Sequence, residues 1–122
     1  MAVIEVILKE GGVIEVAHNF QPVEETEYVH WHFKNPDDEV KRVTIEFADA
    51  DYFQVSGAPT RSFSRTLGHS DTIYGRPPAG RSFPKLGDHL VSGIRDKYSI
   101  TTFDEDDNEI GSLDPEIVPI KP

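Results

Sequence analysis

The stretch YVHWHF, residues 28–33, alternates apolar and polar side chains along its whole length. Successive side chains of a β-strand point to opposite faces, so Val29, Trp31 and Phe33 are predicted to face a core. Tyr28 and the two histidines of this stretch are then predicted to face away from it. The pattern is typical of a strand with one buried face.

A second alternating run follows the turn signal NPDD at residues 35–38. Val43, Ile45 and Phe47 form its apolar side. We expect the two runs to pair as a hairpin at the centre of the core, with Ile100 packed against it.

Both ends of the chain also predict strands. Val3–Leu8 and Val13–Ala17 flank a Gly-Gly turn signal. The first of them carries apolar residues on both faces, which predicts a strand that is either covered on both sides or shared between two sheets. Residues 97–103 and 111–120 flank an acidic turn and predict the closing strands.

Glycine and proline interrupt every window between Asp49 and about Asp88, so two or three short strands with long excursions are expected there. Regular structure is expected again at His89–Ile94. No amphipathic helix of ten or more residues is expected. Seven to nine short strands separated by turns predict an all-β fold, a single Greek-key β-sandwich domain over residues 1–122 with a long irregular middle segment.

The composition excludes several classes of function. The net charge of −10 disfavours nucleic acid, because phosphate contacts need clustered lysine and arginine, and it disfavours anionic membrane surfaces in the same way. No apolar run approaches the roughly 20 residues of a membrane helix. Without cysteine there is no disulfide framework to argue for export, so a cytoplasmic location is expected. An exported form whose signal has been removed stays open.

The chain resembles the cupredoxin family over roughly residues 13–48 and 89–120. The shared features are a strand of the type x-V-x-W-x-F-x-N, a glycine-rich middle, a tyrosine-containing penultimate strand and a short loop before the last strand. The resemblance implies the Greek-key sandwich.

The resemblance does not extend to the copper ligands of that family. Lys41, Arg42 and Val43 stand where its first histidine is expected, and the only methionine is Met1. A blue-copper site needs a cysteine thiolate, and this chain has no cysteine. We therefore expect no cofactor, and no intense visible absorption when copper is added.

His30 and His32 form an H-x-H pair on one strand face. Two residues apart on a strand, their Cβ atoms lie roughly 6–7 Å from each other, close enough for both imidazoles to bind one Zn²⁺ or Cu²⁺. A third ligand would come from His18, His69, His89 or a carboxylate. The alternative is that both histidines are polar residues on a solvated face.

Residues 57–90, which make up most of the irregular middle segment, differ in charge from the remaining chain. Residues 57–90 hold five cationic and two anionic side chains, whereas the whole chain carries −10. Arginine and aromatic residues are enriched at interface cores, and loops on rigid sandwiches commonly carry recognition. The candidate residues for binding a protein partner or a second copy are Arg61, Arg65, Arg76, Arg81 and Phe83. Alternatively, these arginines pair with the chain's own carboxylates.

These observations favour a non-catalytic binding or assembly module. A metal-binding protein or small metalloenzyme built on His30 and His32 is the first alternative. A carbohydrate-binding module using exposed aromatics such as Tyr52, Tyr74 and Phe83 is the second. An enzyme is disfavoured, because the chain has no G-x-S-x-G, P-loop or G-x-G-x-x-G motif.

Overall fold

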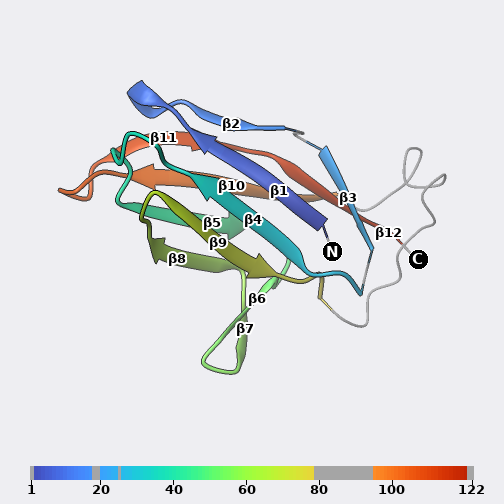
Figure 1. Cartoon of the computed structure of the whole chain (residues 1–122). Coiled ribbons are helices and arrows are strands. Elements are labelled where there is room, and N and C mark those ends of the chain that lie inside the picture. The colour runs from blue at the N-terminus through green and yellow to red at the C-terminus, as the bar shows by residue number, and fades with distance from the viewer. Residues whose placement is uncertain (1, 18–19, 25, 79–94, 121–122) are drawn as a thin grey trace.

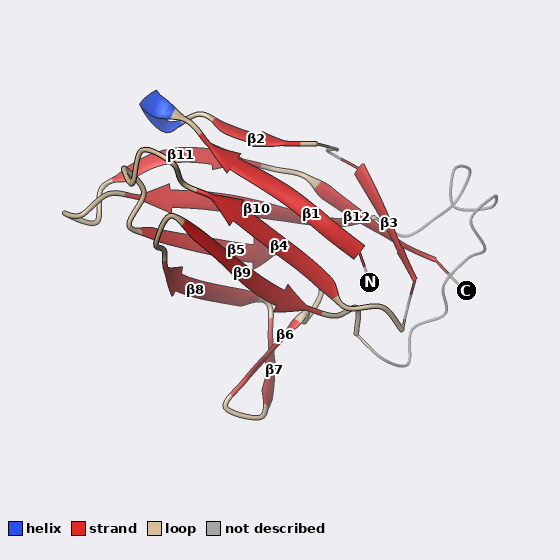
Figure 2. Ribbon diagram, viewed as in Figure 1, coloured by secondary structure: helices blue, strands red, loops and turns tan. Residues whose placement is uncertain are grey.

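The computed structural model describes residues 2–17, 20–24, 26–78 and 95–120. Their regular structure is entirely β apart from one three-residue 3₁₀ turn, Glu10–Gly12 (Figures 1 and 2). No helix in this part of the chain has the length and apolar character needed to cross a membrane. The strands are β1 (Ala2–Leu8), β2 (Ile14–Val16), β3 (Phe20–Glu24), β4 (Val29–Lys34), β5 (Arg42–Phe47), β6 (Phe53–Val55), β7 (Ala58–Thr60), β8 (Ser62–Thr66), β9 (Ser70–Gly75), β10 (Asp96–Phe103), β11 (Glu109–Leu113) and β12 (Glu116–Ile120).

Two sheets pack face to face as a β-sandwich, which confirms the predicted fold class (Figure 1). The first sheet has the order β2-β1-β4-β9, and the second has the order β3-β12-β10-β5-β8, with β11 also paired to β10. Most neighbours are antiparallel, but β1 runs parallel to β4 and β3 runs parallel to β12. A short hairpin of β6 and β7 projects from the edge of the sandwich (Figure 2).

The predicted hairpin of residues 28–47 is wrong in its pairing. β4 lies in the first sheet and β5 in the second, so the two strands face each other across the core. The buried side chain of Asn35 holds the connection between them, donating hydrogen bonds to the carbonyl oxygens of Val40 (2.7 Å) and Gly68 (3.2 Å). An alternating pattern identifies the buried face of a strand but not the sheet to which the strand belongs.

The prediction that β1 is covered on both faces is also wrong. Its even-numbered residues are buried, whereas Val3 on the opposite face is 45% exposed. The predicted pairing of β1 with the following strand is confirmed, because Val6 lies opposite Val16 in an antiparallel register.

The middle segment is more regular than predicted. Residues 53–75 contain four strands, and β8 and β9 extend the second and first sheets, respectively. The count of twelve described strands therefore exceeds the expected seven to nine. A two-residue turn at Ser56 and Gly57, both with positive φ, joins β6 to β7. The strand expected at His89–Ile94 lies outside the described residues.

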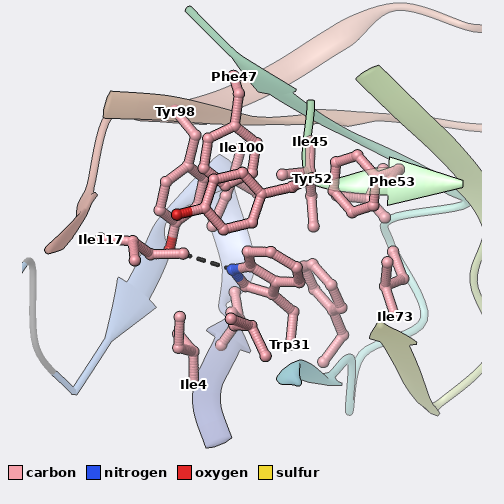
Figure 3. Close-up of a cluster of buried hydrophobic side chains, with 14 of the residues drawn as sticks. Ile4, Trp31, Ile45, Phe47, Tyr52, Phe53, Ile73, Tyr98, Ile100 and Ile117 are labelled. Carbon is pink, nitrogen blue, oxygen red and sulfur yellow. Dashed lines mark hydrogen bonds between the residues drawn. The ribbon is translucent and has the colours of Figure 1, made fainter. Parts of the chain in front are cut away.

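The predicted core is confirmed. Val29, Trp31, Phe33, Val43, Ile45, Phe47 and Ile100 are all buried. Phe47 is at the centre of an aromatic cluster in which its ring contacts those of Trp31, Tyr52, Phe53 and Tyr98 (Figure 3). The cluster joins the two sheets through a hydrogen bond that the Trp31 indole N–H donates to the Tyr98 hydroxyl, at 3.1 Å.

Tyr98 is expected to make the free energy of unfolding fall at alkaline pH. Burial raises the pKa of its hydroxyl well above the ordinary value of about 10, and the hydrogen bond from Trp31 opposes this only in part. Above about pH 10 the unfolded chain loses this proton while the folded chain keeps it. The Tyr98 contribution to stability should therefore be complete below that pH and decline above it by about 1.4 kcal/mol per pH unit. Urea unfolding between pH 8 and 11.5 measures how the free energy of unfolding changes per pH unit. This change should be smaller in the Tyr98→Phe variant. An equal slope in the variant would contradict this assignment.

Candidate functional site

The outward face of the first sheet gathers most of the exposed apolar side chains of the described residues. The strand register places Val3, His30 and Tyr74 in one row across β1, β4 and β9. Tyr28 precedes β4, and its exposed side chain lines the same pocket as Tyr74. Five large apolar side chains are exposed in the described part of the chain, and three of them, Val3 (45%), Tyr28 (53%) and Tyr74 (55%), belong to this face.

A pocket of about 500 Å³ opens beside these side chains. Tyr28, Tyr74 and Arg76 line it from the first sheet, and Asp51 and Gln54 line it from the segment around β6. Tyr52 also lines the pocket but is buried, and its hydroxyl donates a 2.6 Å hydrogen bond to the Asp96 carboxylate. We call Val3, Tyr28, His30, Tyr74 and Arg76 the aromatic patch.

The candidate arginines differ in their partners. Arg61 forms an ion pair with Asp51, and Arg65 forms one with Asp71, each with an N–O distance of 3.2 Å. Arg76 instead lies over the ring of Tyr28, with its guanidinium carbon 5.6 Å from the ring centre. Among residues 2–17, 20–24, 26–78 and 95–120, no carboxylate forms an ion pair with Arg76. Arg81 and Phe83 lie outside the described residues.

His30 and His32 share the outward face of β4, as predicted, but their contacts differ. The His30 ring packs edge-on against Tyr74, with the ring centres 4.4 Å apart. The His32 Nε2 atom is hydrogen-bonded to the Ser70 hydroxyl at 3.0 Å, and its Nδ1 atom lies 3.5 Å from a carboxylate oxygen of Glu5. No group of three metal-ligating side chains occurs in the part of the chain that the structure describes. His18 and His89, two of the possible third ligands, lie outside that part.

Sequence reasoning found some of these residues and missed others. It predicted Tyr28 on the outward face but did not identify it as a site residue, and it named Tyr74 as a candidate exposed aromatic. The expectation of an exposed Tyr52 is wrong, because its ring stacks on Phe47 inside the core. The grouping of Tyr28, Tyr74 and Arg76 depends on the pairing of β4 with β9, for which the sequence carries no local signal.

Comparison with models of protein families, with curated proteins and with solved structures finds no match to this chain.

Proposed function

We propose that this protein is a binding module, built on a cupredoxin-like scaffold, that engages a protein partner through the aromatic patch. The observation that carries the proposal is the position of Arg76, which has no ion-pair partner among the described residues and lies beside two half-exposed tyrosines at the mouth of a pocket.

The chemistry of the patch matches that of interface centres. Tyrosine and arginine are enriched among the residues that contribute most to binding, because they bury a large area at a small cost in conformational entropy. The neighbouring carboxylate of Asp51 is already paired with Arg61. The partner should therefore present a carboxylate to Arg76, and apolar groups to Tyr28 and Tyr74.

A different protein fits this patch better than a second copy of the chain. In a two-fold symmetric dimer, the same surface of each copy would face the other. The nearby carboxylates of Glu5 and Asp51 are already paired with basic side chains of the same chain. In such a dimer Arg76 would face a surface on which these two carboxylates are already paired, so it would gain neither of them as an unpaired partner.

Selection of a random displayed peptide library on the immobilised protein tests the proposal. Enriched peptides should share an aspartate or glutamate near an apolar residue. Arg76→Glu should weaken their binding by about 30-fold, which corresponds to about 2 kcal/mol for a central arginine. Raising the salt concentration should weaken binding to the wild type, because salt screens exposed charges over about 8–10 Å.

Lys97→Glu is the matched control, since it makes the same change in net charge on the exposed face of β10 in the other sheet. It should leave peptide binding unchanged. Peptides that bind equally well to the Arg76→Glu variant, or a selection that enriches no acidic peptide, would refute the proposal. Patch-dependent self-association in sedimentation would instead identify a second copy as the partner.

A carbohydrate ligand is a second candidate, favoured by one observation. Tyr28 and Tyr74 border a pocket that also presents the polar side chains of Gln54 and Asp51. Aromatic faces with adjacent hydrogen-bonding groups suit a sugar ring. A glycan array distinguishes the two functions: specific glycan binding that is lost in Tyr74→Ala, without enrichment of acidic peptides, would favour the carbohydrate.

A further inference from the structure

A second group of side chains lies on the outward face of the first sheet, next to the aromatic patch. Glu5 on β1, His32 on β4 and Ser70 on β9 come from three adjacent strands. A Glu5 carboxylate oxygen lies 3.5 Å from His32 Nδ1, and His32 Nε2 is 3.0 Å from the Ser70 oxygen. Acid, imidazole and hydroxyl therefore form one continuous chain of contacts.

The order of these contacts is the one that activates a serine. A proton on Nδ1, facing the Glu5 carboxylate, leaves Nε2 free to accept the hydrogen bond from the Ser70 hydroxyl. The second carboxylate oxygen of Glu5 lies 3.6 Å from the Lys34 ammonium, with which it forms an ion pair but no hydrogen bond. Hydroxyl, base and orienting group are the parts that nucleophilic catalysis requires.

Lys34 adds a fourth element. The register of β4 and β9 places Lys34 directly opposite Ser70, and cross-strand partners project on the same side of a sheet. The Lys34 ammonium lies 3.6 Å from the Glu5 carboxylate, so its positive charge is on the same sheet face as Ser70 and favours negative charge that develops there on an attacked carbonyl oxygen.

We propose that Ser70 is a nucleophile that accepts acyl groups from small carboxylic esters, with His32 as its base. Ser70 Oγ attacks the ester carbonyl carbon while its proton passes to His32 Nε2. The resulting oxyanion collapses, the bond to the leaving oxygen breaks, and that oxygen takes the proton from His32. Water then attacks the acyl-serine by the same proton path and releases the carboxylic acid. Glu5 is a positioning residue for His32.

The exposure of the group determines the class of ester. Ser70 is exposed and lies at the start of β9 on an open sheet face, so the substrate need not enter an enclosed site. Small activated esters, or acyl groups presented on a larger surface, have access to it. This activity is separate from partner binding, because it uses none of the five residues of the aromatic patch.

The test uses p-nitrophenyl acetate for turnover and a fluorophosphonate probe for covalent labelling, followed by peptide mapping. The probe should label Ser70 stoichiometrically, and acetate should be found on the same residue. Ser70→Ala should abolish both signals. His32→Ala should slow labelling by about 100-fold, within the range for loss of a general base.

Ser64 provides the matched control, because it is an exposed strand serine whose hydroxyl is hydrogen-bonded to Thr44 at 2.8 Å and not to a histidine. It should remain unlabelled, and Ser64→Ala should react like the wild type. The role of Glu5 is tested by nitrogen NMR, which should show the Nδ1–H tautomer of His32 in the wild type. Glu5→Gln should lose this tautomer and Glu5→Asp should partly restore it. The rate at which the probe labels Ser70 should change in the same order. Acylation confined to lysines, or equal labelling of Ser64 and Ser70, would overturn the proposal.

Discussion

Replacing Phe47 with alanine is expected to lower the free energy of unfolding by about 3–5 kcal/mol. Its buried ring contacts four other aromatic rings and stacks on Tyr52 with a centre-to-centre distance of 3.9 Å (Figure 3). The cost combines the lost transfer of the ring from water, the lost ring–ring contacts and the cavity that remains between the two sheets. Urea denaturation followed by the fluorescence of Trp31, the only tryptophan of the chain, measures this loss directly.

Tyr74→Ala is the matched comparison, because it also removes one aromatic ring from a strand residue, but from the exposed face. Its effect on the free energy of unfolding should stay within about 0.5 kcal/mol. In the folded wild type, Trp31 emission should be shifted to short wavelength and shielded from iodide, since the indole is fully buried. Similar losses for both variants, or an indole that iodide quenches, would contradict the assigned core.

Gly12→Ala is expected to destabilise the protein by about 2–5 kcal/mol. Gly12 has φ = +80°, and a Cβ atom built there would overlap the backbone carbonyl of Ile110 on β11. The left-handed conformation costs a non-glycine residue about 1–2 kcal/mol, and overpacking adds about 1–3 kcal/mol. Because the obstacle is backbone, no side-chain rotation relieves it. The turn between β1 and β2 touches the second sheet at this point.

Gly11→Ala separates the two costs. Gly11 has nearly the same backbone angle, φ = +78°, but open space where its Cβ would lie. Only the conformational cost of about 1–2 kcal/mol should therefore appear. Thermal or urea unfolding of the two variants side by side gives the difference, which is the share due to the contact with β11. Equal destabilisation would mean that the turn can shift away from Ile110 without cost.

The sequence predicts local features of this fold well because they depend on periodicity. Alternation in residues 28–33 and 42–47 identifies the residues that face the core, and turn signals place the ends of these strands. The pairing of strands is different. Nothing local distinguishes a hairpin of β4 with β5 from the observed crossing between sheets, since both satisfy the same buried faces.

The candidate site was less predictable for the same reason. His32 and Ser70 are separated by 38 residues, and only the pairing of β4 with β9 brings them together. The histidine next to Ser70 in the sequence is His69, so adjacency along the chain gives no indication of the contact with His32. The sequence reveals the positive charges of Arg61 and Arg65 but not the carboxylates that pair with them. An acidic chain offers many carboxylates, and only the fold determines which of them lie close enough.

The position of β10 has a consequence for the protein during its synthesis. β10 pairs with β5 on one side and with β11 and β12 on the other, yet it follows all the strands of the first sheet along the chain. On the ribosome, a nascent chain that has exposed only residues 1–78 holds β5 with one edge unpaired, because Phe47 and Ile45 still lack their in-sheet partners Tyr98 and Ile100. Unpaired edges and uncovered apolar faces favour aggregation during synthesis. We therefore expect the nascent chain to depend on chaperones until the last quarter of the sequence has emerged.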